Sequence, residues 1–398
     1  MSNQSRAEEL LTALINGEQV EIEPRSRAEK YLNNCVKKCG CDDLPTPRTR
    51  IEALYYQLAE QLAGGGGGSG GGDTLKALLD ATKSARYLCY YSALESMEGL
   101  IPYNATENVT TTNNMFDNCF KLKTVALFDT SKVNQMVKMF NCCSALTTVP
   151  LFDTSNVTNM ASMFYGCSSL TTVPQFDTSN VIDMSNMFYA CNALTTVPQF
   201  DTSSVTTMSN TFYGCRKLTE VPLLDTSKVT SMSYMFQGCE GLTEVPLYDT
   251  SKVTNIGGMF QSCPRLVTVP AFDLRSVTSN SYTFNANTKA ITGIWFRNIK
   301  TTLQVSDGTS YGHLLTIDSL IHLVKELRDT GSSKTLTMAT VNLDKLANVY
   351  VRTVTVTDEM RAEDDLIDEK LACEVCESTD EGAMTITEYA TLKNWILK

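Results

Sequence analysis

One 24-residue unit repeats without insertions through residues 116–296 and constrains the fold more than any other feature of the sequence. Its consensus is F-x-x-C-x-x-L-T-x-V-P-x-F-D-T-S-x-V-T-x-M-x-x-M. A fixed period of this length is typical of structural repeats that stack on one another, so the sequence predicts a repeat solenoid. The Phe that opens each unit recurs as Phe116, Phe140, Phe164, Phe188, Phe212, Phe236, Phe260 and Phe284.

The spacing inside the unit predicts how one coil is built. Apolar residues fall at every third position from Phe164 to Phe176, which matches neither the period of a helix nor that of a strand. We therefore predict a flattened coil of short extended pieces joined by bends, with coils stacked about 4.8 Å apart. A Pro follows this Val in six units, at 150, 174, 198, 222, 246 and 270, and cannot donate a backbone hydrogen bond, so the ladder between coils should stop there.

The stretch DTSNVTNMASMFYGCSSLTTVP (153–174) resembles the BspA-type leucine-rich-like surface repeat of bacterial, protist and phage proteins. The resemblance covers about half of the chain. It implies a leucine-rich-repeat-like, right-handed solenoid of mostly short β segments with turns, used in adhesion or recognition. It brings no catalytic residues.

The N-terminal part of the chain differs from the repeat in composition. Residues 1–63 contain three short amphipathic helices that are too short to be stable alone, which predicts a docking module that is oligomeric or particle-bound. GGGGGSGGG at 64–72 is a flexible linker. We expect residues 73–115 to cap the first coil. The predicted helices cover about 6–16, 27–38, 48–62 and, in the cap, 74–88.

Residues 116–300 form the predicted solenoid, and residues 301–398 a small α/β C-terminal region. In the latter we expect a helix at 316–331, a strand-like segment at 334–346, and a helix followed by a strand at 383–398. The last two segments resemble the closing unit that follows such repeats in phage tail-fibre-like proteins. The acidic insert at about 358–381 departs from that resemblance, and its fold is left open.

Two segments indicate a context for the protein. EIEPRSRAEKYLNNCV (21–36) and PTPRTRIEALYYQLAEQLA (45–63) resemble structural proteins of phages of Gram-positive gut bacteria. The resemblance implies a virion protein, made in the host cytoplasm, that contacts other tail or head proteins through residues 1–63 and forms a homo-oligomer. The first residues do not match a signal peptide, which favours this interpretation. The alternatives are a bacterial surface or secreted adhesin, and a decoration or spacer protein without a ligand.

Charge and chemistry argue against several functions. The net charge of −11 is unfavourable for binding nucleic acid, and no run of about 18 apolar residues predicts insertion into a membrane. No paired carboxylates or nucleophile with a base stand out, so we expect no enzyme and no cofactor. Cys373 and Cys376 form a CxxC without further ligands, and His313 and His322 are the only histidines.

Two ladders of the repeat could carry chemistry. We expect the repeated Cys to be buried, reduced and inert. The repeated Asp starts an Asp-Thr-Ser turn, and we favour hydrogen bonds within that turn over a calcium column because the glycine-rich calcium repeat is absent. These ladders comprise Cys119, Cys143, Cys167, Cys191, Cys215, Cys239 and Cys263, and Asp129, Asp153, Asp177, Asp201, Asp225, Asp249 and Asp273.

Residues between the core positions form the candidate ligand-binding surface. One line follows the repeat Phe, and a second precedes the repeat Val. Tyrosine offers apolar contact and a hydroxyl at low entropic cost, which suits binding of a host cell-surface glycan or protein. The alternative is that these tyrosines only shield the edge of the coil. The two lines are Tyr165, Tyr189, Tyr213, Gln237 and Gln261, and Thr171, Thr195, Thr219 and Thr243.

Overall fold

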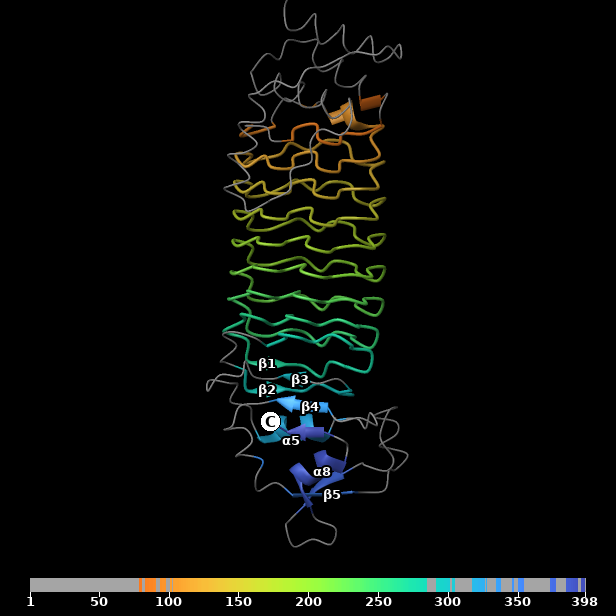
Figure 1. Ribbon diagram of the computed structural model, residues 1–398. Coiled ribbons are helices and arrows are strands. Elements are labelled where there is room, and N and C mark those ends of the chain that lie inside the picture. The colour runs from red at the N-terminus through yellow and green to blue at the C-terminus, as the bar shows by residue number, and fades with distance from the viewer. Residues whose placement is uncertain are drawn as a thin grey trace, which may run out of the picture. The chain divides into compact units, whose positions relative to one another are not determined.

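The computed structural model describes the repeat region and parts of the C-terminal region (Figure 1). Two compact units, Met1–Ser168 and Ser169–Lys398, are each described by themselves. The predicted helices of residues 1–63 and the linker at 64–72 lie outside the described residues. The described residues are 79–80, 83–90, 94–97, 101, 103–284, 291–300, 303–304, 317–325, 327, 334–337, 346, 350–353, 373–376, 384–392 and 395–397.

In both units the repeat Phe side chains stack on one another in the core. The rings of Phe116 and Phe140 lie 5.3 Å apart at 3°, and those of Phe188 and Phe212 lie 5.8 Å apart at 3°. The Cys, Leu, Val and Met of each coil are largely buried beside them. Each fully buried side chain of this size contributes roughly 1.5–3 kcal/mol. The structure thus confirms a repeat fold of stacked coils (Figure 1), and within each unit these coils share a continuous apolar interior.

Most hydrogen bonds between coils lie in the bend around the repeat Phe, and the structure has fewer strands than the sequence suggested. The N–H groups of Tyr234 and Phe236 donate to the carbonyls of Gly257 and Met259 in the next coil, at 2.8 and 3.1 Å. Two residues in each bend have left-handed φ values, at the positions two before and two after the Phe. Because such residues reverse the direction of neighbouring N–H groups, the bend pairs along the stack without forming a strand.

The first extended pairing in the repeat region is β1 (Thr268–Val269), which is parallel to β2 (Gly293–Ile294). β1 ends directly before Pro270, whose carbonyl accepts the N–H of Phe272 at 2.7 Å. The ladder therefore breaks at this proline, as predicted. Residues 291–300 continue the coil pattern, with Ile291, Phe296 and Ile299 buried.

The repeated Cys side chains are buried and free, as predicted, but they also donate hydrogen bonds. The Sγ of Cys215 lies 3.1 Å from the carbonyl oxygen of Phe188, and that of Cys239 lies 3.1 Å from the carbonyl of Phe212. A weak S–H donor thus gives each of these buried carbonyls a second hydrogen bond, beside the one from the backbone N–H of Cys191 or Cys215. Burial raises the pKa of the Cys263 thiol to about 12, so it stays protonated at neutral pH.

The helix predicted for 74–88 is wrong beyond residue 83. Leu79 and Asp80 are helical, but Lys83 and Tyr87 have φ values of 52° and 58°, which an α-helix does not contain. Ser84 pairs with Thr111 instead, so residues 83–90 form a coil of the stack. A 3-10 helix, η1 (Tyr103–Thr106), follows in the cap.

The C-terminal region contains two small sheets. One is parallel and consists of β3 (Leu303–Gln304), β4 (Lys334–Thr337) and β8 (Trp395–Leu397). The other is antiparallel and consists of β5 (Tyr350–Thr353), β6 (Cys373–Cys376) and β7 (Met384–Thr385). β6 lies within the acidic insert whose fold the sequence left open.

Two helices accompany these sheets, α5 (Ile317–Lys325) and α8 (Ile386–Leu392). Thr385 and Glu388 form a capping box, since each accepts the backbone N–H of the other, and this defines the start of α8. The helix predicted for 316–331 is wrong at Leu327, which forms a bridge with Ile299. No helix in the described part of the chain is long and apolar enough to cross a membrane.

Candidate recognition surface

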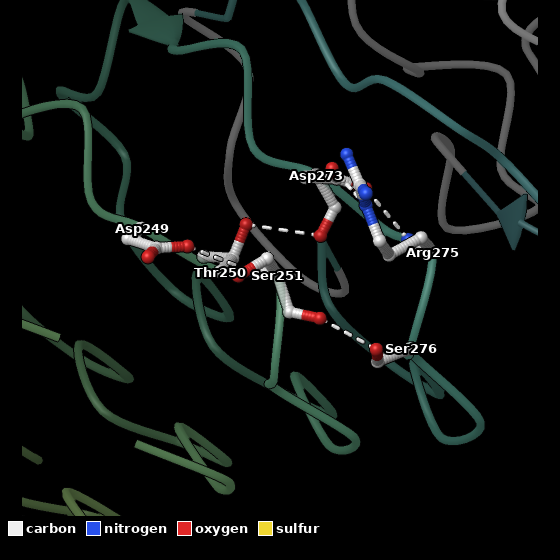
Figure 2. A network of polar contacts seen from close by, with 6 residues as sticks. All are labelled: Asp249, Thr250, Ser251, Asp273, Arg275 and Ser276. Atoms are coloured by element: carbon white, nitrogen blue, oxygen red, sulfur yellow. Dashed lines mark hydrogen bonds and ion pairs between the residues drawn. The ribbon is translucent and has the colours of Figure 1, made fainter. Parts of the chain in front are cut away.

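The Asp-Thr-Ser turns are held by hydrogen bonds, as the sequence predicted. In the turn shown in Figure 2, the N–H of Ser251 donates to Asp249 Oδ1 at 3.0 Å, and Thr250 Oγ1 donates to the backbone carbonyl of Asp273 in the next coil at 3.0 Å. Asp273 in turn accepts the backbone N–H of Arg275 at 2.8 Å and pairs with its guanidinium. The carboxylate therefore fixes its own turn, and the threonine joins neighbouring coils.

The carboxylates of the Asp-Thr-Ser turns accept hydrogen bonds from the serines of their own turns. Hydrogen bonds from Ser179 and Ser203 lower the pKa values of Asp177 and Asp201, which keeps both side chains ionised at neutral pH. Among the described residues, no three His, Cys, Asp or Glu side chains gather as ligands for a metal ion. The turn interpretation of the Asp ladder is confirmed by these contacts.

A second turn surrounds each repeat Phe. We call the four residues from two before the Phe to one after it the Phe turn; Asn210–Tyr213 is one example. Its last residue donates to the carbonyl of its first, as Tyr213 N does to Asn210 O at 3.1 Å and Gln237 N to Tyr234 O at 3.1 Å. The predicted line of Tyr and Gln therefore occupies the last position of successive Phe turns. In every described Phe turn the first residue has a left-handed φ.

The predicted tyrosines are half-buried. Tyr189 and Tyr213 stack with their ring centroids 4.2 Å apart at 8°, so each ring covers a face of the other. Tyr165 occupies the same position in the first unit and is half-buried as well. Gln237 and Gln261 continue the position in the second unit, also half-buried.

The predicted threonine line is exposed. Thr171, Thr195, Thr219 and Thr243 all lie in the second unit with exposed side chains. Neighbouring coils are joined beneath them, since the N–H of Thr195 donates to the carbonyl of Thr171 at 3.2 Å. The structure thus brings these threonines into one row at equal steps.

The sequence analysis missed two exposed tyrosines at the first position of their Phe turns. Tyr234 and Tyr282 have φ values of 56° and 60° and are 36% and 59% exposed. A left-handed conformation costs a bulky residue about 1–2 kcal/mol, whereas Asn tolerates it. Asn186 and Asn210 hold this position in earlier coils of the same unit. The exchange of Asn for Tyr at one repeat position was the available sequence signal.

A buried acid occupies the last position of a Phe turn in the first unit. Asp117 accepts amide hydrogen bonds from Asn114, Asn118 and Asn141 at 2.7, 2.7 and 2.6 Å. Burial raises the pKa of Asp117 to about 6, although the amide donors and the charge of Lys138 act in the opposite direction. This polar cluster replaces the tyrosine found at the same position in later coils.

The remaining candidate residues have structural surroundings. Cys373 and Cys376 are the first and last residues of β6. His322 Nε2 lies 2.9 Å from the carbonyl of Trp295 and 3.0 Å from that of Phe296, which joins α5 to the last coil. His313 lies outside the described residues.

The coils and turns described above define a class, a repeat protein of stacked coils with exposed rows of side chains. Residues 90–197 and 192–294 match the family described as "Mycoplasma protein of unknown function, DUF285". The two matches together span just over half of the chain, so the chain belongs to this family.

Two solved structures are similar to part of the chain. A leucine-rich repeat protein from Bacteroides ovatus is 19% identical over 46% of this chain and 56% of that protein, with a TM-score of 0.24. A leucine rich cell surface protein from Faecalibacterium prausnitzii is 18% identical over 46% of this chain and 75% of that protein, with a TM-score of 0.19. The chain thus spans little more than half the length of the Bacteroides protein. No curated protein matches the chain.

Proposed function

We propose that this chain is a non-enzymatic recognition protein displayed at a bacterial cell surface, where the exposed rows of its coils bind a glycan or a protein. The observation that carries the proposal is the division of each coil into invariant and variable positions. Phe, Cys and Leu recur in the core, whereas the residue after the Phe changes from Tyr to Gln along the second unit. A rigid interior thus holds variable side chains at fixed steps, which suits recognition.

The surface context replaces the virion as the favoured interpretation. The sequence segments that resembled phage proteins lie in residues 1–63, outside the described residues. Neither of the two solved structures named above is described as a phage protein, and one is described as a cell surface protein. The docking of residues 1–63 and the formation of a homo-oligomer remain part of the proposal.

The chemistry of the described residues supports a role without catalysis. The repeated carboxylates are engaged in turns, and the repeated thiols are buried and donate to carbonyls. Burial raises the pKa of the Cys89 thiol to about 12, which leaves no thiolate nucleophile there at neutral pH.

Protease treatment of intact cells that make the protein tests its location. We expect peptides from residues 103–284 to be released without lysis, while an internal marker enzyme stays inside. Release only after lysis, or co-sedimentation of the chain with phage particles in a density gradient, would contradict surface display.

Binding of the purified full chain to whole cells tests the recognition role. Replacing Tyr165, Tyr189 and Tyr213 together by Ala should reduce the bound amount if this line contacts the partner. A second variant replaces Thr171, Thr195 and Thr219 by Ala and tests the threonine line in the same way. If neither variant changes the bound amount, the partner does not contact these two lines.

A further inference from the structure

The two tyrosines at the start of their Phe turns combine exposure with an unfavourable backbone conformation. Tyr234 and Tyr282 are two coils apart in the second unit, which corresponds to about 10 Å along the stack at the usual strand spacing. Their left-handed φ values favour Asn or Gly, so neither tyrosine is explained by the needs of the turn. Every described Phe turn has this conformation, so what distinguishes these two positions is the large exposed side chain that they carry.

The coil between them is adapted to the first tyrosine. Gly258 holds the equivalent position, and a Cβ added there would lie 2.2 Å from two ring atoms of Tyr234. The ring of Tyr234 therefore lies against the bare backbone of the next coil, where any other residue would displace it. Gly257 precedes Gly258, so this coil carries two adjacent residues without side chains. The glycine thus determines the orientation of an exposed ring.

Polar residues lie in the same turns and the same coil as the two tyrosines. Gln237 closes the turn that Tyr234 opens, and Gln261 closes the turn that Gly258 opens, each through a 3.1 Å backbone hydrogen bond. Ser279 and Ser281 are exposed in the coil of Tyr282. Aromatic faces that contact C–H groups, next to amides and hydroxyls that bond O–H groups, match the chemistry of a sugar chain.

We propose that Tyr234 and Tyr282, together with Gln237 and Gln261, form a binding site for a neutral glycan chain that runs along the stack. The site deepens the recognition function proposed above and rests on it. The net charge of −11 disfavours an anionic glycan. A protein partner is disfavoured because a stable interface buries about 800 Å² on each side, and two tyrosines among small polar residues supply only a fraction of that area.

Three variants of the full chain test the site. Tyr234→Asn and Tyr282→Asn, made together, install the residue found at 186 and 210, which tolerates the left-handed φ. Gly258→Asn keeps both rings but displaces that of Tyr234. Tyr189→Asn with Tyr213→Asn tests the tyrosine line at the other end of the turn separately. Circular dichroism and urea unfolding establish that each variant is folded.

The probes are cellohexaose, chitohexaose, xylohexaose and laminarihexaose, with calorimetry on the parent chain and each variant. We expect at least one probe to bind, with binding weakened about tenfold or more by the Tyr234/Tyr282 double variant and by Gly258→Asn. The Tyr189/Tyr213 double variant should weaken binding less than either of these.

The outcomes separate this inference from the recognition function itself. Glycan binding that is lost only in the Tyr189/Tyr213 variant overturns the site but leaves recognition intact. Absence of binding to all four glycans, with retained binding to whole cells, overturns the glycan assignment and points to a protein partner. Absence of binding to glycans and cells alike overturns both proposals.

Discussion

The second unit holds tyrosines at both ends of the Phe turn, and the two ends differ in what the ring contacts. At the last position, Tyr189 and Tyr213 stack on each other 4.2 Å apart and are half-buried. At the first position, Tyr234 and Tyr282 are exposed and adopt a left-handed φ. The same residue type in the same turn therefore stabilises the stack at one end and adds strain at the other.

The difference teaches where stability and recognition can be separated in a repeat. A stacked aromatic pair contributes roughly 0.5–1.5 kcal/mol beyond its buried area. A left-handed tyrosine costs the fold about 1–2 kcal/mol, so some benefit other than folding has to account for it. Variation at the first position thus indicates function more clearly than variation at the last.

Replacing the buried Phe of a turn should have the largest effect on stability, because this side chain supports both ends of the turn. Phe212 is the third residue of the Asn210–Tyr213 turn, and Phe236 is the third residue of the Tyr234–Gln237 turn. Both rings are buried in the same stack. Phe212→Ala and Phe236→Ala should each cost about 3–5 kcal/mol of unfolding free energy in urea. A cost below about 1 kcal/mol at either position would mean that the coils do not share one interior.

A pH titration tests the last position of the Phe turn in the first unit, where Asp117 takes the place of the tyrosine found in later coils. The pKa of Asp117 is about 6 in the folded chain and has a reference value of 3.8, so the folded state binds the proton more tightly. Its ionised form is therefore destabilising at pH 7, and stability should rise as the pH falls through 6 towards 4.

The full gain is about 3 kcal/mol, from roughly 1.4 kcal/mol for each unit of pKa, and about 2 kcal/mol of it is reached by pH 4.5. Thermal unfolding of the parent chain between pH 7 and 4.5 measures it. The carboxylates with lowered pKa values lose their contributions only below this window. Asp117→Asn should remove most of the pH dependence; an equally steep dependence in that variant would contradict the assignment.

Replacing a repeated Cys should lower the stability by a smaller amount, and by the same amount at Cys215 and at Cys239. Cys215→Ala and Cys239→Ala each remove one of the two hydrogen bonds that a buried Phe carbonyl accepts, which should cost about 0.5–1.5 kcal/mol. Labelling of the parent chain with a thiol reagent should be slow at both positions until urea is added. Rapid labelling of the folded chain at either Cys would show that the ladder is open.

The interior of the repeat could be predicted from the sequence because a fixed 24-residue period leaves little freedom in which residues face inward. The Asp turns could be predicted for a similar reason, since Asp-Thr-Ser is a local motif with its own hydrogen bonds. The hydrogen bonds that the Cys215 and Cys239 thiols donate could not be predicted, because their acceptors are backbone atoms of a neighbouring coil, 27 residues away in sequence.

Backbone conformation was the second feature that could not be predicted from the sequence. The segment 74–88 has apolar residues that suit either a helix or a coil, and only the left-handed φ of Lys83 and Tyr87 distinguishes the two. The same property hid Tyr234 and Tyr282, since a pattern of apolar positions contains no information about φ. The line through Tyr189 and Tyr213 was found because it repeats in consecutive coils.

The central claim is that the stacked pair Tyr189 and Tyr213 stabilises the coils, whereas the left-handed φ of Tyr234 and Tyr282 offsets the contact that a ring makes with the next coil. Urea unfolding of two double variants tests it most directly, because both install Asn in the same unit. We predict that Tyr189→Asn with Tyr213→Asn lowers the unfolding free energy by about 1–2 kcal/mol through loss of the stack. Tyr234→Asn with Tyr282→Asn should leave it unchanged or raise it by up to about 1 kcal/mol through relief of the left-handed tyrosines. Equal destabilisation by both variants, or a larger loss from the second, would contradict the account.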